Sequence, residues 1–116
     1  MPELSPMLSV AVDAARAAET VIMRDYGSNR GLQVKPDQTP VTAADQEAEC
    51  LIVGMLSERF PEHGFLGEEY GMTKPDAEHI WIIDPIDGTK NYIRGIPLFG
   101  TQIALMHRGR LVLGVS

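Results

Sequence analysis

Residues 79–89 read HIWIIDPIDGT, an apolar run that ends in two carboxylates, Asp84 and Asp87, around a proline. The run predicts a buried β-strand, and Pro85 and Gly88 predict a stiff turn that opens where the strand ends. Two carboxylates three residues apart on such a turn can converge on one cation. Since oxygen ligands of this kind suit Mg²⁺ or Mn²⁺ better than Zn²⁺, the stretch favours a hard divalent cation. An ordinary strand end with a tight Asp-Gly turn is the alternative interpretation.

The residues on either side of this turn suggest an anion site and a further carboxylate. Gly88-Thr89 can begin a helix whose free backbone N–H groups face an anion, so that metal and phosphate share one turn. Upstream, Gly67-Glu68-Glu69 follows a short apolar run, and one carboxylate of the pair could point into the same pocket. A solvated acidic turn is the alternative for this pair.

Farther from the turn, two helical patterns precede the strands. Apolar residues recur at helical spacing over residues 5–26, before Gly27, and again over residues 43–59, after Thr42. Two prolines in residues 31–40 predict an extended loop between them. Short apolar runs then predict strands at residues 64–66, 79–84, 98–106 and 111–115, with a hairpin at residues 107–110. This order predicts an α+β fold in which two helices pack on a mainly antiparallel sheet.

The composition fits one globular domain and narrows the classes of function. The chain has 116 residues, and its 16 acidic and 10 basic residues give a net charge of -6, which argues against binding to nucleic acid or an anionic membrane. No apolar stretch approaches the ~20 residues of a membrane span, and residues 1–5 do not resemble a signal peptide, so we expect a cytoplasmic protein. Cys50, the sole cysteine, lies in a helical pattern and is predicted to be a packing residue. The histidines lack the spacing of metal ligands and are predicted to be structural or exposed: His63, His79 and His107.

Three ordered motifs resemble the inositol monophosphatase superfamily. Residues 84–89 match its DPxDGT marker, residues 67–69 match its GEE motif, and residues 41–45 are similar to its VTxAD segment. Order and spacing agree along nearly the whole chain, which implies the amino-terminal part of the layered α/β sugar-phosphatase fold. Members carry a further aspartate ligand in a WDxAA-like segment well downstream, and this sequence ends inside an apolar strand before such a segment. We therefore expect residues 1–116 to be the amino-terminal, metal- and phosphate-binding portion of a phosphatase domain.

The resemblance also implies roles for individual residues. The metal ligands would be Glu68, Asp84, Asp87 and the backbone carbonyl of Ile86, holding Mg²⁺ or Mn²⁺. The phosphate of the substrate would contact Ile86, Asp87, Gly88 and Thr89. Catalysis would involve Glu68, Asp45 and Thr89, of which Asp45 and Thr89 together would orient the attacking water. No covalent phosphoenzyme is needed in such a reaction.

Residues 90–97 read KNYIRGIP and resemble the histidinol-phosphatase branch, where a KN-aromatic-x-RG-x-P run is typical. The resemblance implies a homodimer that hydrolyses a small phosphate monoester with magnesium, and histidinol phosphate is the first expected substrate. Inositol 1-phosphate is an alternative substrate. Adenosine 3',5'-bisphosphate is another, because a loop like residues 35–40 occurs both in the histidinol-phosphatase branch and in relatives that cleave this nucleotide. A non-catalytic, truncated phosphatase fold that acts by binding a partner is the alternative from another class.

Overall fold

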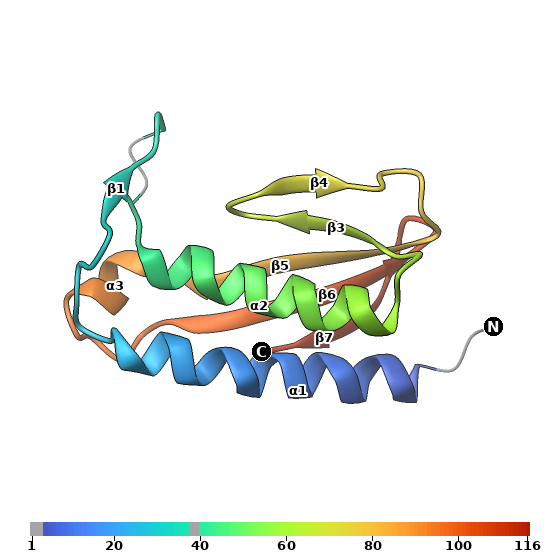
Figure 1. Ribbon diagram of the computed structural model, residues 1–116, viewed down its shortest axis with the longest axis horizontal. Helices are drawn as coiled ribbons and strands as arrows, with labels where there is room; N and C mark the ends of the chain where they lie inside the picture. Colours follow the sequence, from blue (N-terminus) through green and yellow to red (C-terminus); the bar gives the residue numbers. More distant parts are fainter. Residues whose placement is uncertain (1–3, 38–39) are drawn as a thin grey trace.

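Two long helices cover one face of a five-stranded sheet (Figure 1). The computed structural model describes residues 4–37 and 40–116. The helices are α1 (Ser5–Arg24), α2 (Ala43–Arg59) and the short α3 (Thr89–Ile93). The strands are β1 (Gln33–Val34), β2 (Pro40–Val41), β3 (Gly64–Gly67), β4 (Gly71–Thr73), β5 (His79–Asp87), β6 (Gly100–His107) and β7 (Arg110–Val115). Within the described residues, no helix combines the length and the apolar character needed to cross a membrane.

The five-stranded sheet has the strand order β4-β3-β5-β6-β7. Strands β3 and β5 are parallel, and the other neighbouring pairs in this sheet are antiparallel. The predicted arrangement of two helices on a mainly antiparallel sheet is therefore confirmed. The sequence pattern missed β4 and the small β1–β2 hairpin, which lies in the stretch predicted to be an extended loop. Gln38 and Thr39 of that loop lie outside the described residues.

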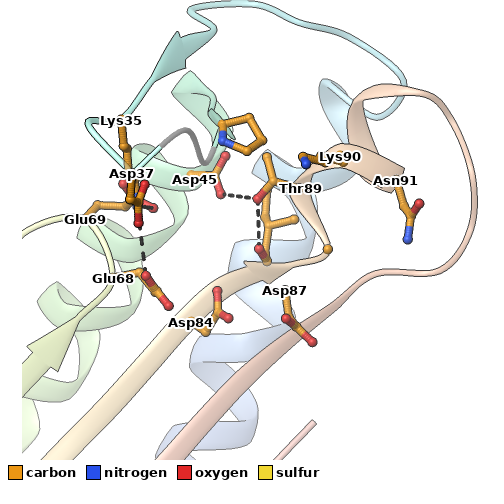
Figure 2. A pocket seen from close by; sticks show the side chains of 13 residues that line it. Lys35, Asp37, Asp45, Glu68, Glu69, Asp84, Asp87, Thr89, Lys90 and Asn91 are labelled. Atoms are coloured by element: carbon orange, nitrogen blue, oxygen red, sulfur yellow. Dashed lines mark hydrogen bonds and ion pairs between the residues drawn. The ribbon is translucent and has the colours of Figure 1, made fainter.

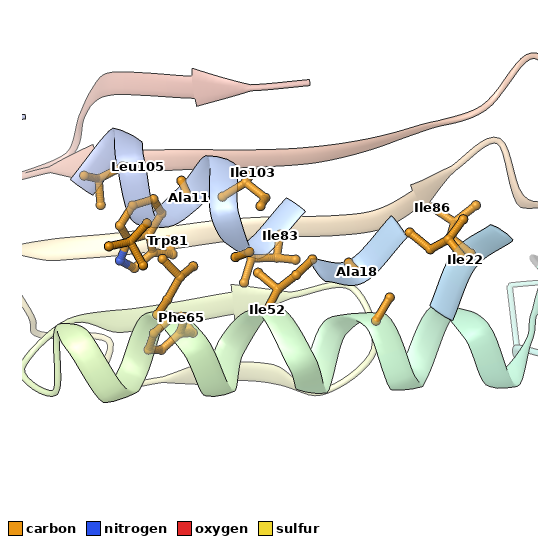
Figure 3. Packing of buried hydrophobic residues seen from close by; sticks show 14 of the residues in the cluster. Ala11, Ala18, Ile22, Ile52, Phe65, Trp81, Ile83, Ile86, Ile103 and Leu105 are labelled. Carbon is orange, nitrogen blue, oxygen red and sulfur yellow. The ribbon is translucent and has the colours of Figure 1, made fainter. Parts of the chain in front are cut away.

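The core lies between the two long helices and the sheet (Figure 3). Trp81 and Ile83 of β5 are buried on the same side, because alternate residues of a strand face the same side of the sheet. The helices meet this side with the small residues Ala11, Ala14 and Ala18 of α1 and the larger residues Ile52 and Leu56 of α2. This packing brings the N-terminus of α2 beside the end of β5, where the sequence predicts the functional residues (Figure 1).

The predicted connection between the last two strands is confirmed as a tight hairpin. Arg108 has a φ of 51° and Gly109 a φ of 78°. Positive φ at both central residues is typical of the two-residue turn that matches the twist of paired strands. Arg108 also donates its backbone N–H to the carbonyl of Glu78, which immediately precedes β5.

Other details differ from the sequence-based expectations. Helix α1 ends at Arg24, two residues before the predicted end, and β5 continues beyond Asp84 to Asp87. The prediction that Cys50 is a packing residue is wrong, because its side chain is exposed. The buried positions of α2 follow a four-residue spacing that includes Ala48 and Ile52. Cys50 lies midway between these two positions in sequence and therefore points to the opposite side of the helix.

Candidate active site

The predicted site residues meet in one open cavity of about 560 Å³ at the end of β5 (Figure 2). The cavity is lined by residues from the β1–β2 region, α2, the β3–β4 turn, β5 and α3. Its lining includes the whole predicted set: Asp45, Glu68, Asp84, Ile86, Asp87, Gly88 and Thr89. The sequence interpretation did not assign the other lining residues to the site: Lys35, Asp37, Pro40, Glu69, Lys90 and Asn91.

A β-bulge brings the two aspartates of β5 to the same face of the sheet. Asp84 pairs with Gln102 of β6 and Asp87 with Gly100, so three steps along β5 oppose two along β6. In a regular strand, residues three apart point to opposite faces, and one extra residue restores the same face. Ile86 then joins the buried core, while Asp87 accepts a hydrogen bond of 3.2 Å from Gln102 Nε2. The bulge therefore brings both carboxylates to one face, as the sequence-based hypothesis of a shared cation requires.

Negative charges repel one another in the cavity. Burial, followed by the charges of Glu68 and Asp87, raises the pKa of Asp84 to about 6 from an ordinary value of 3.8. A bound cation would relieve this repulsion, and the residues around Asp84 offer only oxygen atoms as ligands. Among the described lining residues there is neither a histidine nor a cysteine. The donor set therefore fits a hard cation such as Mg²⁺ or Mn²⁺ and does not fit Zn²⁺.

Asp45 is fixed at the first turn of α2 and reaches Thr89 at the start of α3. Thr42 caps the helix, and its backbone N–H and hydroxyl both lie 2.7 Å from Oδ2 of Asp45. The other carboxylate oxygen, Oδ1, lies 3.2 Å from the hydroxyl of Thr89. That hydroxyl is also 3.1 Å from the carbonyl oxygen of Ile86, and its single proton can be donated to one acceptor at a time. The capping box thus holds the carboxylate that orients Thr89.

Gly88 allows the chain to turn between the aspartates and α3. Its φ is 90°, in the left-handed region that favours glycine, and a Cβ atom there would lie 2.8 Å from the carbonyl oxygen of Leu98. The same carbonyl accepts a hydrogen bond of 2.9 Å from Asn91 Nδ2. Tyr92 is buried and donates its hydroxyl to the carbonyl of Ile22 in α1. The contacts of Asn91 and Tyr92 anchor α3 directly after Lys90, which lines the cavity.

The two glutamates that follow Gly67 differ in their surroundings. The side chain of Glu68 is 53% exposed, lines the cavity and points toward Asp84 (Figure 2). The side chain of Glu69 is 8% exposed and pairs with Lys35, whose Nζ lies 3.2 Å away. Lys35 Nζ is also 3.9 Å from Glu68. The sequence predicted that one carboxylate of this pair faces the pocket, and both line it. It did not predict that Lys35 lies beside the pair.

A second group of possible ligands lies at the opposite end of β5. The rings of His79 and His107 stack with centroids 4.3 Å apart, and His63 stacks on the other side of His79 at 4.6 Å. Possible ligand atoms of Glu78, His79 and His107 lie within 4.8 Å of one another, although the sequence spacing did not indicate this. The unprotonated nitrogen of each ring directs its lone pair in the ring plane, so two stacked rings only 11° from parallel do not point at one ion. Glu78 is also paired with Arg108 at 3.1 Å, and we therefore interpret the stack as packing.

Comparison with known proteins finds relatives over nearly the whole chain. Residues 3–116 match the sequence family described as the inositol monophosphatase family. An inositol-1-monophosphatase from Mesorhizobium japonicum is 45% identical over 114 residues, which cover 96% of this chain and 43% of that protein. A histidinol-phosphatase from Chlorobaculum parvum is also 45% identical over 114 residues, covering 97% of this chain and 44% of that protein.

Solved structures share the fold. The extragenic suppressor protein suhB from Bartonella henselae superposes with a TM-score of 0.88 at 40% identity, over 96% of this chain and 43% of that one. An IMPase from Thermotoga maritima gives a TM-score of 0.88 at 32% identity, over 95% of this chain and 43% of that one. The chain therefore spans less than half the length of these relatives.

Proposed function

Since this chain belongs to the inositol monophosphatase family, we propose that it forms the metal- and phosphate-binding part of a phosphomonoesterase. The observation that supports this best is the convergence of two kinds of group around one cavity. One is the carboxylate set of Glu68, Asp84 and Asp87, and the other is the hydrogen-bonded pair of Asp45 and Thr89. The reaction would consume one water molecule and release inorganic phosphate and an alcohol.

The cation would be Mg²⁺ or Mn²⁺, held by the side chains of Glu68, Asp84 and Asp87 and the carbonyl of Ile86. When bound, it would offset the repulsion between these carboxylates and a phosphate dianion and make a nearby water more acidic. Lys35 and Lys90 also line the cavity, but Lys35 is already paired with Glu69. Carboxylates outnumber lysines in the lining, so the bound cation would supply most of the positive charge that attracts a phosphate to a chain with a net charge of -6.

Asp45 and Thr89 would orient the attacking water. When Thr89 donates its proton to Oδ1 of Asp45, the lone pairs of its hydroxyl are free to accept a hydrogen bond from a water molecule. Asp45 cannot rotate away readily, because Oδ2 accepts two hydrogen bonds from Thr42. A water held in this way keeps its oxygen directed at the phosphorus, and such positioning lowers the barrier of hydrolysis.

Substrate phosphate would bind at the turn of residues 86–89. The first N–H groups of a helix lack intrahelical partners, and α3 begins at Thr89 with Gly88 before it. On the strand side of the turn, the resemblance implies that Ile86 and Asp87 also contact the phosphate, and both residues line the cavity. Gly88 adds no side chain to this turn, and the carbonyl of Leu98 leaves no room for one.

Histidinol phosphate is the substrate that we propose first, because residues 90–97 follow the histidinol-phosphatase pattern. Relatives named inositol-1-monophosphatase and histidinol-phosphatase share the same identity of 45%, so identity alone does not distinguish the two substrates. The test measures phosphate release from histidinol phosphate, inositol 1-phosphate and adenosine 3',5'-bisphosphate. The assay uses a protein that contains this chain and has the full length of its relatives. We call it the full-length protein. The highest kcat/KM for histidinol phosphate would support the proposal, and a preference for either other ester would reassign the substrate.

A further inference from the structure

Glu49 is a fully buried carboxylate of α2 that does not line the cavity described above. Its exposed fraction is 0%, and it follows Asp45 by one helical turn. Its partners are two backbone groups of the β3–β4 turn. The N–H of Glu69 donates to Oε1 at 2.9 Å, and the N–H of Tyr70 donates to Oε2 at 2.8 Å. Since a buried charge without partners is strongly unfavourable, these hydrogen bonds tie the turn to α2.

Gly67 shows how closely the turn lies against this carboxylate. A Cβ atom at position 67 would be 2.3 Å from Oε2 of Glu49 and 2.4 Å from its carboxyl carbon. No side chain therefore separates the end of β3 from the carboxylate. The GEE motif begins with glycine at the place where Glu49 needs direct contact with the backbone.

Glu68 lies between the two points at which the turn is held. Gly67 contacts Glu49 before it, and Glu69 donates to Glu49 after it. Its own N–H donates to the carbonyl of Ile83 at 3.2 Å, so its backbone is also tied to β5. The side chain of Glu68 is long and half-exposed, and a fixed backbone is what keeps it directed at the cavity.

We propose that Glu49 is a positioning residue that holds the β3–β4 turn so that Glu68 reaches the cation, and that it thereby sets the metal affinity of the cavity. This inference rests on the proposed function, because it needs Glu68 to be a ligand. Two N–H donors require two acceptor oxygens, which glutamate offers and glutamine does not. In Glu49→Gln, the amide –NH₂ would face one of the two N–H groups and displace part of the turn. Loss of a group that orients a metal ligand typically weakens metal affinity by roughly 10–100-fold.

Glu47→Gln is a matched control for this substitution. Glu47 lies on the same helix and loses the same charge, but it is exposed and pairs with Arg24 and Arg30. Titration calorimetry with Mn²⁺ on the full-length protein should show at least a tenfold weaker Kd for Glu49→Gln and a change within about twofold for Glu47→Gln. Thermal unfolding in the same buffer identifies the folded variants. An unchanged Kd in folded Glu49→Gln, or equal weakening in both variants, would overturn the inference.

Hydrogen exchange on the unsubstituted protein tests the same contact without a folding risk. The amides of Glu69 and Tyr70 should exchange slowly both with and without Mn²⁺, because Glu49 holds them in either state. Fast exchange at both amides without the metal would overturn the inference. If the unsubstituted protein binds no Mn²⁺ at all, the proposed function itself fails, and this outcome is distinct from failure of the role of Glu49.

Discussion

The hydroxyl of Thr89 lies 3.2 Å from Oδ1 of Asp45, although 44 positions separate the two residues in the sequence. The contact joins the N-terminus of α2 to that of α3, and it closes one side of the cavity that the carboxylates of β5 line. Two groups of residues with different chemical properties therefore line this cavity. The carboxylates suit a cation, and the Asp45–Thr89 pair suits a water molecule.

Substitution of one residue from each group should separate metal binding from turnover. Asp87→Asn removes a ligand charge, so we expect both Mn²⁺ affinity and turnover to be lost in the full-length protein. Thr89→Ala should keep the Mn²⁺ Kd within about threefold and lower kcat by roughly 10²-fold, because it removes the hydroxyl that we propose orients the attacking water. Asp45→Asn should resemble Thr89→Ala in both its Mn²⁺ Kd and its kcat. Calorimetry and steady-state kinetics provide the two measurements, and unchanged metal binding in Asp87→Asn would refute its role as a ligand.

Metal affinity should depend on pH through Asp84, whose pKa is raised to about 6. Below this pKa a proton occupies the carboxylate and must leave before the cation binds, so affinity should fall by up to tenfold per pH unit. The pKa of Asp84 in the folded protein lies above the unfolded value of 3.8. Ionisation of Asp84 therefore lowers the free energy of unfolding of the metal-free protein as pH rises from about 4 to 6. Added Mn²⁺ should therefore raise the Tm more at pH 7.5 than at pH 5. A Kd that stays constant between pH 5 and 7.5 would contradict this prediction.

Two glycines should respond in opposite directions to replacement by alanine. Gly88→Ala places a Cβ atom 2.8 Å from the carbonyl of Leu98 at a φ of 90°, and should lower the free energy of unfolding by roughly 1–3 kcal/mol. Gly54 is exposed within α2, with no atom within 4 Å of the added Cβ. Gly54→Ala should therefore raise stability by about 0.5–1 kcal/mol, because alanine favours the helix. Urea unfolding measures both, and a neutral Gly88→Ala would show that the turn is not constrained as described.

The histidine stack should make the fold sensitive to acid. Burial, and then the neighbouring His79, lowers the pKa of His63 to about 4 from 6.5. Trp81 Nε1 donates to His63 Nδ1 at 2.9 Å, which requires that nitrogen to be unprotonated. The folded pKa is below the unfolded one, so this contribution to stability is complete above pH 6.5 and is lost as pH falls toward 4. The expected loss is on the order of 1 kcal/mol, because solvent screens part of the effect.

His63→Asn provides the comparison for this acid sensitivity. Asparagine keeps an acceptor for Trp81 but cannot be protonated in this range. Thermal unfolding between pH 7.5 and 4.5 should show a smaller decrease in Tm for the variant than for the unsubstituted chain. Parallel decreases in the two proteins would assign the acid sensitivity to other groups.

The long helices and the position of the site could be predicted because their signals are local. The apolar spacing of α1 and α2 and the cap at Thr42 are properties of adjacent residues, and the structure confirms both helices. The meeting of Glu68 with Asp84 in one cavity was expected from the order of the motifs, and the structure brings them together. The turn at Arg108-Gly109 was also visible in the sequence.

Features that depend on contacts between distant segments could not be predicted in this way. Strand β4 has three exposed residues, so it carries no apolar pattern and exists because β3 supplies hydrogen bonds. The bulge in β5 depends on its register with β6, and proline at position 85 suggested instead that the strand ends. Glu49 accepts hydrogen bonds from the N–H groups of Glu69 and Tyr70, and the sequence pattern of α2 did not indicate this contact. Lys35 reaches the cavity only through the fold of the β1–β2 region.

The most direct test of the central claim is the dependence of hydrolysis on a hard cation. The full-length protein is assayed with its best phosphate monoester before chelation, after exhaustive chelation, and after addition of Mg²⁺, Mn²⁺ or Ca²⁺. Because every proposed ligand is an oxygen atom, activity should disappear with the chelator and return with Mg²⁺ or Mn²⁺, while Asp87→Asn stays inactive throughout. Full activity after exhaustive chelation would contradict the account.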